Sequence, residues 1–82
     1  MNSPKRLKPN TLKNYSSKQL AKHLDRLQDH FIDKDLTPPY RVDFSYLEIR
    51  KYDQECDAYL FQGISKESIE EAINDTYRLL GI

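Results

Sequence analysis

The sequence predicts a small α+β domain, and three patterns along its 82 residues support this fold class. One amphipathic helical pattern follows Ser16 and another follows Ser65, while residues 40–62 between them alternate apolar and polar side chains as strands do. A chain of this length forms one domain with a modest core. The expected order is α-β-β-α, with an antiparallel hairpin packed against two helices in a domain over residues 16–82.

Residues 1–15 are predicted to form a disordered, flexible basic tail ahead of this domain. Pro4 and Pro9, together with several cations and asparagines, interrupt any periodic pattern there. Residues 1–22 contain six basic residues and no acid, whereas residues 53–75 contain seven acids and one base, Lys66. The formal net charge of zero hides this sorting, so the folded chain is expected to be dipolar.

The first helix has a clear start. Ser16 can cap it and Gln19 stands three residues later, which is the capping-box spacing. One narrow face is apolar for about four turns, and its residues are Leu20, Leu24, Leu27 and Phe31. The helical pattern fades at residues 33–35, and the two prolines at positions 38 and 39 rule out its continuation.

The middle of the chain is predicted to form one hairpin. Residues 40–46 alternate strictly, which places Phe44 and Tyr46 on the side of Tyr40 and predicts both in the core. The alternation of apolar and polar residues then shifts by one position, and a β-bulge near residues 46–47 would allow one strand to include both parts. Residues 53–55 are the expected turn and residues 56–62 the returning strand. Periodicity alone also permits a helix with a ragged apolar face over residues 44–62.

The last helix follows Gly63, which ends the returning strand. Ser65 is the expected cap, and Gly81 suits the position just after the helix. The buried stripe is expected to comprise Ile69, Ala72, Ile73, Thr76, Tyr77 and Leu80. This strand-to-helix corner resembles the corner of hairpin-plus-helix DNA-binding modules and HicB-like antitoxin domains. Its residues are general turn and cap signals, so the resemblance implies no function.

The sequence offers no constellation for catalysis, and we expect no enzyme and no cofactor. His23 and His30 are seven residues apart, about 10 Å along a helix, which is too far for one metal ion. Cys56 is expected on a strand between two acids, which would disfavour its thiolate. Two glycines in the chain leave no phosphate-binding loop.

The composition also bears on location. A single cysteine cannot form an internal disulfide, and it suits a reducing compartment. No apolar run is long enough for a membrane span or a signal peptide, so we expect no membrane partner and a cytoplasmic protein.

The function expected from these features is that of a small non-enzymatic interaction protein. It would act as an adaptor, a regulator or a stoichiometric inhibitor of a larger macromolecule, of the kind that phages and plasmids encode. An acidic surface would contact a protein with a basic surface, and exposed aromatic residues would anchor the contact. The candidate protein-binding residues are Tyr52, Asp53, Glu55, Asp57, Tyr59, Phe61, Glu67, Glu70 and Glu71.

Two alternatives remain open. The chain could be a small nucleic-acid-binding module that holds phosphates with its basic tail and first helix. The residues for that role are Lys5, Arg6, Lys8, Lys13, Lys18, Lys22 and Arg26. The chain could also form a homodimer, with the leucine stripe of the first helix paired across a two-fold axis.

Overall fold

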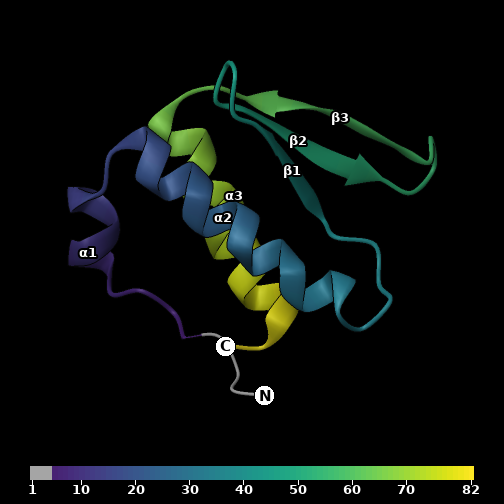
Figure 1. Ribbon diagram of the computed structural model, residues 1–82, viewed down its shortest axis with the longest axis horizontal. Coiled ribbons are helices and arrows are strands. Elements are labelled where there is room, and N and C mark those ends of the chain that lie inside the picture. Colours follow the sequence, from purple (N-terminus) through teal and green to yellow (C-terminus); the bar gives the residue numbers. More distant parts are fainter. Residues whose placement is uncertain (1–4) are drawn as a thin grey trace.

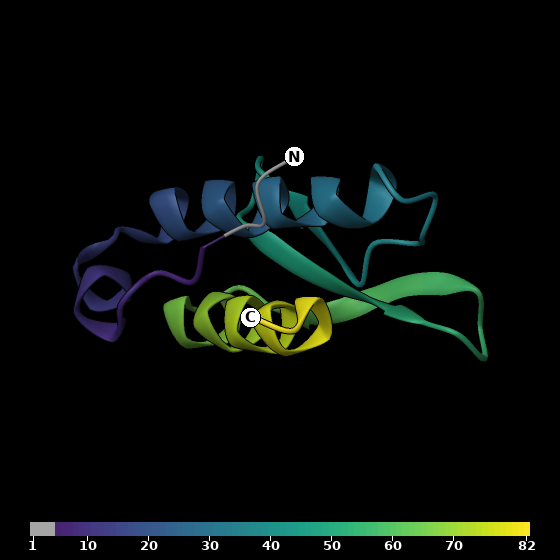
Figure 2. The same cartoon turned by 90° about the horizontal axis from the view of Figure 1, so that it is seen from below.

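The computed structural model describes residues 5–82 and has the expected α+β class, with three helices and a three-stranded antiparallel sheet. The order is α1 (Pro9–Asn14), α2 (Ser17–Ile32), β1 (Tyr40–Asp43), β2 (Glu48–Asp53), β3 (Ala58–Gly63) and α3 (Lys66–Leu80). The helices α2 and α3 lie side by side and run in the same direction (Figure 1). Seen from below, α2 and α3 form a layer that covers one face of the sheet (Figure 2).

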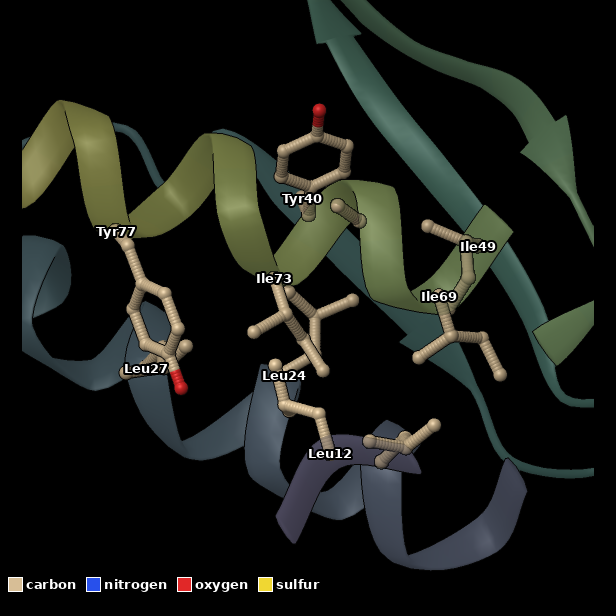
Figure 3. Close-up of a cluster of buried hydrophobic side chains, with 10 residues drawn as sticks. Leu12, Leu24, Leu27, Tyr40, Ile49, Ile69, Ile73 and Tyr77 are labelled. Carbon is tan, nitrogen blue, oxygen red and sulfur yellow. The ribbon is translucent and has the colours of Figure 1, made fainter. Parts of the chain in front are cut away.

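The core lies where the apolar stripes of α2 and α3 meet each other and the sheet (Figure 3). Leu20 and Leu24 of α2 are completely buried, as are Ile69, Ile73 and Tyr77 of α3. Because the chain itself covers the leucine stripe of α2, that stripe is not free to pair with a second copy as the dimer alternative expected.

Both long helices begin and end as their sequences predict. The Ser16 hydroxyl accepts a hydrogen bond from the Gln19 N–H, and the Gln19 side chain accepts one from the Ser16 N–H at 2.8 Å. Ser65 caps α3 by accepting from the N–H of Ser68. Gly81 follows α3 with a φ of 76°, a left-handed conformation that glycine adopts without steric cost.

The predicted single hairpin is wrong in detail, because the sheet is a meander of three strands in the order β1-β2-β3. The shift in alternation at Leu47 is a tight turn and not a bulge, and the chain reverses over residues 44–47. Phe44 and Tyr46, expected in the core, lie in this turn and are 44% and 75% exposed. The only register shift in the sheet of the described chain falls between Ile49 and Arg50.

The two turns of the meander are built alike, ten residues apart. In each, the aspartate that ends the strand accepts a hydrogen bond from the N–H two residues later, with Asp43 bonded to Ser45 and Asp53 to Glu55. Each turn then closes with a non-glycine residue at positive φ, Leu47 at 51° and Asp57 at 50°. The second turn begins at residue 54 and ends at residue 57, so Cys56 is exposed there and does not lie on a strand.

Part of the segment predicted to be a flexible tail has regular structure. Pro9 opens the short helix α1, and Leu12 on this helix is buried against the core. The Leu7 N–H donates a hydrogen bond of 3.0 Å to the hydroxyl of Tyr77, and the Lys66 ammonium donates one to the carbonyl of Lys13. Burial of Leu12 gives this segment a tertiary reason to fold that a sequence pattern six residues long does not reveal. The first four residues of the predicted tail lie outside the described residues.

Polar contacts join β1 to both long helices. The buried Gln28 of α2 accepts a hydrogen bond from the Tyr40 N–H and donates one to the carbonyl of Leu24. The Tyr40 hydroxyl donates to Asp75 of α3 at 2.7 Å. These bonds fix the first strand beneath the helix pair and so determine which face of the sheet stays uncovered.

Candidate functional site

The hairpin formed by β2 and β3 extends beyond the helices (Figure 1, Figure 2). Its ladder pairs Tyr52 with Tyr59 and Arg50 with Phe61. Because paired residues project to the same face and alternate residues share a face, these four side chains lie together on one side of the sheet.

The opposite side of the sheet faces the helices. Tyr40 and Ile49, which are buried beneath the helices, belong to that side, and the register places Lys51 and Leu60 there as well. The alternation therefore directs the other set of side chains away from the helices. We call this helix-free surface the open face, and its residues are Arg41, Arg50, Tyr52, Tyr59 and Phe61.

The aromatic side chains of the open face are held by specific contacts. The rings of Tyr52 and Tyr59 lie 5.3 Å apart between centroids and are tilted by 59°. The guanidinium of Arg41 lies 5.2 Å from the centroid of Tyr59. The Tyr59 hydroxyl donates a hydrogen bond of 2.7 Å to the carbonyl of Pro38, and the Tyr52 hydroxyl donates one to Asp57. The tyrosine pair therefore has a defined orientation before any partner arrives.

Both tyrosines keep their phenolic protons at neutral pH. The hydrogen bond to the Asp57 carboxylate is the main cause that raises the pKa of Tyr52. Burial raises the pKa of Tyr59, although the nearby guanidinium of Arg41 acts in the opposite direction. The face thus presents neutral rings, which are suited to burial in an interface.

Charged groups surround these rings. The Arg50 guanidinium forms an ion pair of 2.7 Å with Glu48, which offsets its charge. Phe61 stands in the strand beside Arg50 and is 62% exposed. The turn at the end of the hairpin adds the carboxylates of Asp53 and Asp57, which also shape that turn. The arrangement is an apolar aromatic centre with a predominantly acidic border.

The structure brings together six of the nine residues expected to bind a protein. Those six lie on the β2–β3 hairpin and its turn, and they are Tyr52, Asp53, Glu55, Asp57, Tyr59 and Phe61. The remaining three, Glu67, Glu70 and Glu71, lie on the first turns of α3, beyond the opposite end of β3 (Figure 1). The expected acidic surface therefore consists of two separate regions.

The sequence predictions omit two residues of the open face, Arg41 and Arg50. Their place depends on the pairing of β1 with β2, which sets them directly opposite each other. A single predicted hairpin lacks that pairing. The turn-forming aspartates at positions 43 and 53 carry the signal that would have revealed the third strand.

The basic residues form a different region. Lys18, Lys22 and Arg26 are exposed and four residues apart, so they follow one stripe along α2. Lys8 directly precedes α1 and Lys13 lies in its last turn, while Lys5 is exposed ahead of α1. The Arg6 guanidinium lies 5.1 Å from the centroid of the Tyr77 ring, so its side chain also packs on the domain.

The remaining reactive side chains are dispersed in the fold. His23 binds the Tyr77 hydroxyl at 2.7 Å, and burial followed by the charge of Arg26 lowers the pKa of His23. Within residues 5–82, no three or more His, Cys, Asp and Glu side chains are grouped so as to hold a metal ion. None of the helices in this part of the chain combines the length and the apolar character that a membrane crossing requires.

Comparisons of this chain with protein-family models, with curated proteins and with solved structures gave no match.

Proposed function

We propose that this protein is a non-enzymatic interaction protein that binds a partner protein through the open face. The observation that supports this most strongly is the aromatic set on a sheet face without helices, on a hairpin that extends past the rest of the domain. Tyrosine and phenylalanine bury a large area at a small cost in side-chain entropy, and interfaces use them as anchors. The protein would then act as an adaptor, a regulator or a stoichiometric inhibitor.

The charges around the open face favour a protein over a nucleic acid as partner. Residues 40–63 contain five acids and three bases, and the ion pair of Arg50 with Glu48 offsets one of each, which leaves four acids and two bases. A phosphate backbone would be repelled by such a surface, because nucleic-acid affinity depends on neutralising phosphates with free cations. The complementary partner surface has an apolar centre and a basic border.

The test compares two double variants with the wild type. Tyr52→Ser with Phe61→Ser removes the aromatic centre, whereas Lys22→Ser with Arg26→Ser changes α2 by an equal number of residues. Each protein is immobilised, and the proteins that it retains from the source cell are identified and then purified for titration. We expect the open-face variant to bind its partner at least about tenfold more weakly, with the α2 variant unchanged.

The opposite pattern, in which only the α2 variant loses the partner, contradicts the proposal. Far-UV circular dichroism and a urea titration on both variants separate loss of the interface from loss of the fold. Both altered hairpin side chains are at least partly exposed, so we expect the fold to persist.

A second candidate function is binding of nucleic acid, and the cationic stripe of Lys18, Lys22 and Arg26 favours it. Deletion of the N-terminal residues is a poor test, because Leu12 belongs to the core. Replacing the three cations of the stripe with glutamine removes the charge and leaves the fold. If the stripe binds an oligonucleotide, log K falls with log salt at about 0.9 per phosphate neutralised, and the glutamine variant shows a shallower slope.

We also propose that the protein acts in the cytoplasm. The support is chemical: Cys56, the single cysteine of the chain, is exposed in the turn after β2 and has no second cysteine to pair with. An exposed free thiol persists in a reducing compartment.

A further inference from the structure

The strand β3 forms one border of the sheet and lacks the charges and prolines that commonly prevent a border strand from pairing. Residues 58–65 contain no charged residue and no proline. Leu60 is 45% exposed, Phe61 is 62% exposed and Ile64 is 61% exposed. Native proteins protect border strands with charges, prolines or short length, since unpaired N–H and C=O groups there can bind another strand. Among the described residues, no element covers the outer side of β3 (Figure 1).

The other border strand of the sheet, β1, has features that prevent it from pairing with another strand. It is four residues long, follows Pro38 and Pro39, and carries Arg41 and Asp43. It also lies beside α2, to which Gln28 joins it. The contrast identifies β3 as the one border of this sheet that is open to pairing.

We propose that β3 pairs with β3 of a second copy of this chain, antiparallel and across a two-fold axis at Leu60. In that register, Leu60 faces Leu60 of the second copy, and Tyr59 faces Phe61 on the open face. Aromatic and aliphatic cross-strand pairs of this kind stabilise antiparallel sheets. An axis at Phe61 would pair Phe61 with itself but set Leu60 opposite Gln62 and Tyr59 opposite Gly63, so Leu60 and Tyr59 would have no apolar partner.

Charge complementarity also favours a second copy over an unrelated strand. With the axis at Leu60, Asp57 of one chain lies beside Gly63 of the other, and the acidic turn over residues 54–57 lies near the place where α3 begins. The N-terminus of a helix is its positive end, and Lys66 stands in that first turn. The acidic turn of each hairpin therefore meets the positive end of a helix, and the symmetry produces this contact twice.

The expected affinity is modest. The register shift near Gln62 limits the regular part of the edge to residues 58–61, so the interface is small. We expect a dissociation constant on the order of 10 μM. This proposal does not rest on the proposed function, although Tyr59 and Phe61 of the open face take part in both surfaces; Leu60, on the helix side of the sheet, belongs to the dimer contact alone. If both hold, the dimer joins two open faces into one continuous surface.

The test is sedimentation velocity on the full chain between about 5 and 500 μM, a range that brackets the expected affinity. The variant Leu60→Lys places two like charges at the axis, and Leu60→Glu does the same with the opposite sign. Leu79→Lys is the matched control, since Leu79 is 57% exposed on α3. We expect the wild type and the control to dimerise, while each Leu60 variant dimerises at least about tenfold more weakly. An equal mixture of Leu60→Lys and Leu60→Glu regains the dimer.

Three results would overturn the proposal. The first is a wild type that stays monomeric at the highest concentration, including one that instead forms a stable complex with a strand of another protein. The second is a dimer that Leu60→Lys leaves intact. The third is a failure of the charge-opposed mixture to associate, because residue 60 then does not face itself across the axis. Circular dichroism of each variant confirms that the monomer is folded.

Discussion

At the scale of single residues, two positions of the turns hold side chains in a conformation that most residues avoid. Leu47 closes the first turn with a φ of 51° and is half-buried, without the glycine or asparagine usual at such a place. Left-handed backbone costs a non-glycine residue about 1–2 kcal/mol. The turn is formed because the sheet on both sides of it overrides the local preference.

The first prediction concerns Leu47. Leu47→Asn is expected to raise the free energy of unfolding by about 0.5–1 kcal/mol, since asparagine tolerates left-handed backbone. Leu47→Val should lower it by at least about 1 kcal/mol, because a β-branched side chain is a severe outlier at positive φ. Urea denaturation of the wild type and the two variants measures their free energies of unfolding. A valine variant as stable as the asparagine variant would refute the assigned strain.

The second prediction concerns His23. Its pKa is lowered in the folded chain, first by burial and then by Arg26, whereas the unfolded chain takes up a proton near pH 6.5. The unfolded state therefore binds more protons below that pH, and the contribution of His23 to stability falls as the pH drops through 6.5. Depending on its tautomer, the neutral ring can accept the Tyr77 hydroxyl proton on Nε2 or donate to the hydroxyl oxygen, whereas the protonated ring can only donate.

Urea titrations at about pH 7.5 and about pH 5.5 test this. The wild type should lose stability between the two, and His23→Gln should lose less, because glutamine does not titrate. His30→Gln on the same helix is the control and should keep the wild-type dependence. Equal pH dependence in all three proteins would dismiss His23 as the titrating group.

At the scale of elements, the contact between β1 and α3 depends on one carboxylate. Burial opposes ionisation of Asp75, but hydrogen bonds from Tyr40 and Arg78 and the charge of Lys51 hold its pKa below the usual value. Burial, with the hydrogen bond to Asp75, in turn raises the pKa of Tyr40. This side of the sheet is therefore fixed to α3 through a charge-assisted bond.

The third prediction is that Tyr40→Phe lowers the free energy of unfolding by about 1.5–3 kcal/mol, the typical value of a hydrogen bond to a charged group. Tyr40→Phe in an Asp75→Asn background should cost less, because the charged acceptor is already gone. The difference between the two costs is the coupling energy of the pair. Additive costs would show that the two side chains act independently.

A close approach joins β3 to α3. A side chain at Gly63, the buried last residue of β3, would collide with the side chain of Ser68, whose Cβ would lie 2.7 Å from the new Cβ. The strand can reach the first turn of the helix only because position 63 has no side chain.

The fourth prediction is that Gly63→Ala lowers the free energy of unfolding by about 1–3 kcal/mol, as overpacking does. The same substitution in a Ser68→Gly background should cost clearly less, because the colliding atoms are gone. Thermal unfolding of the two single variants and the double variant measures this. A double variant as unstable as the sum of the single variants would rule out the collision as the cause.

Elements of this fold differ in how far their sequences predict them. The helices α2 and α3 combine caps with stripes several turns long, and both were predicted nearly to the residue. The three-stranded sheet was predicted as a hairpin, because Leu47 stands where turn rules expect glycine or asparagine and the first turn was therefore missed. The helix α1 has six residues, too few for a periodic pattern, and its formation depends on the burial of Leu12.

The candidate site was predicted less completely than the fold. Alternation along the sequence placed Tyr59 and Phe61 on one face, and this part agrees with the register. Arg41 and Arg50 could be placed on this face only if the third strand was known. The glutamates of α3 could be separated from it only if the direction of β3 was known. Neither piece of information exists in a local pattern, because both depend on how distant segments pair.

At the scale of the whole molecule, the N-terminal segment is part of the domain. Leu12 is 7% exposed and belongs to the main core, and Leu7 and Lys13 are hydrogen-bonded to α3. The fifth prediction is that Leu12→Ala lowers the free energy of unfolding by about 2–4 kcal/mol, the usual cost of removing a buried leucine. Leu79→Ala, at an exposed leucine, should change it by less than about 0.5 kcal/mol. If the two variants are equally stable, residues 5–15 do not contribute to the packed domain and the prediction is wrong.

The bond between Leu7 and Tyr77 spans seventy positions of the chain and has a consequence for synthesis. A nascent chain that has left the ribosome only as far as β3 lacks the apolar stripe of α3, and with it four of the ten residues of the buried cluster. Leu7 therefore cannot form its contact with Tyr77 until α3 has been synthesised. Folding of this domain can be completed only after α3 has been synthesised, and until then the earlier segments are open to chaperones and proteases.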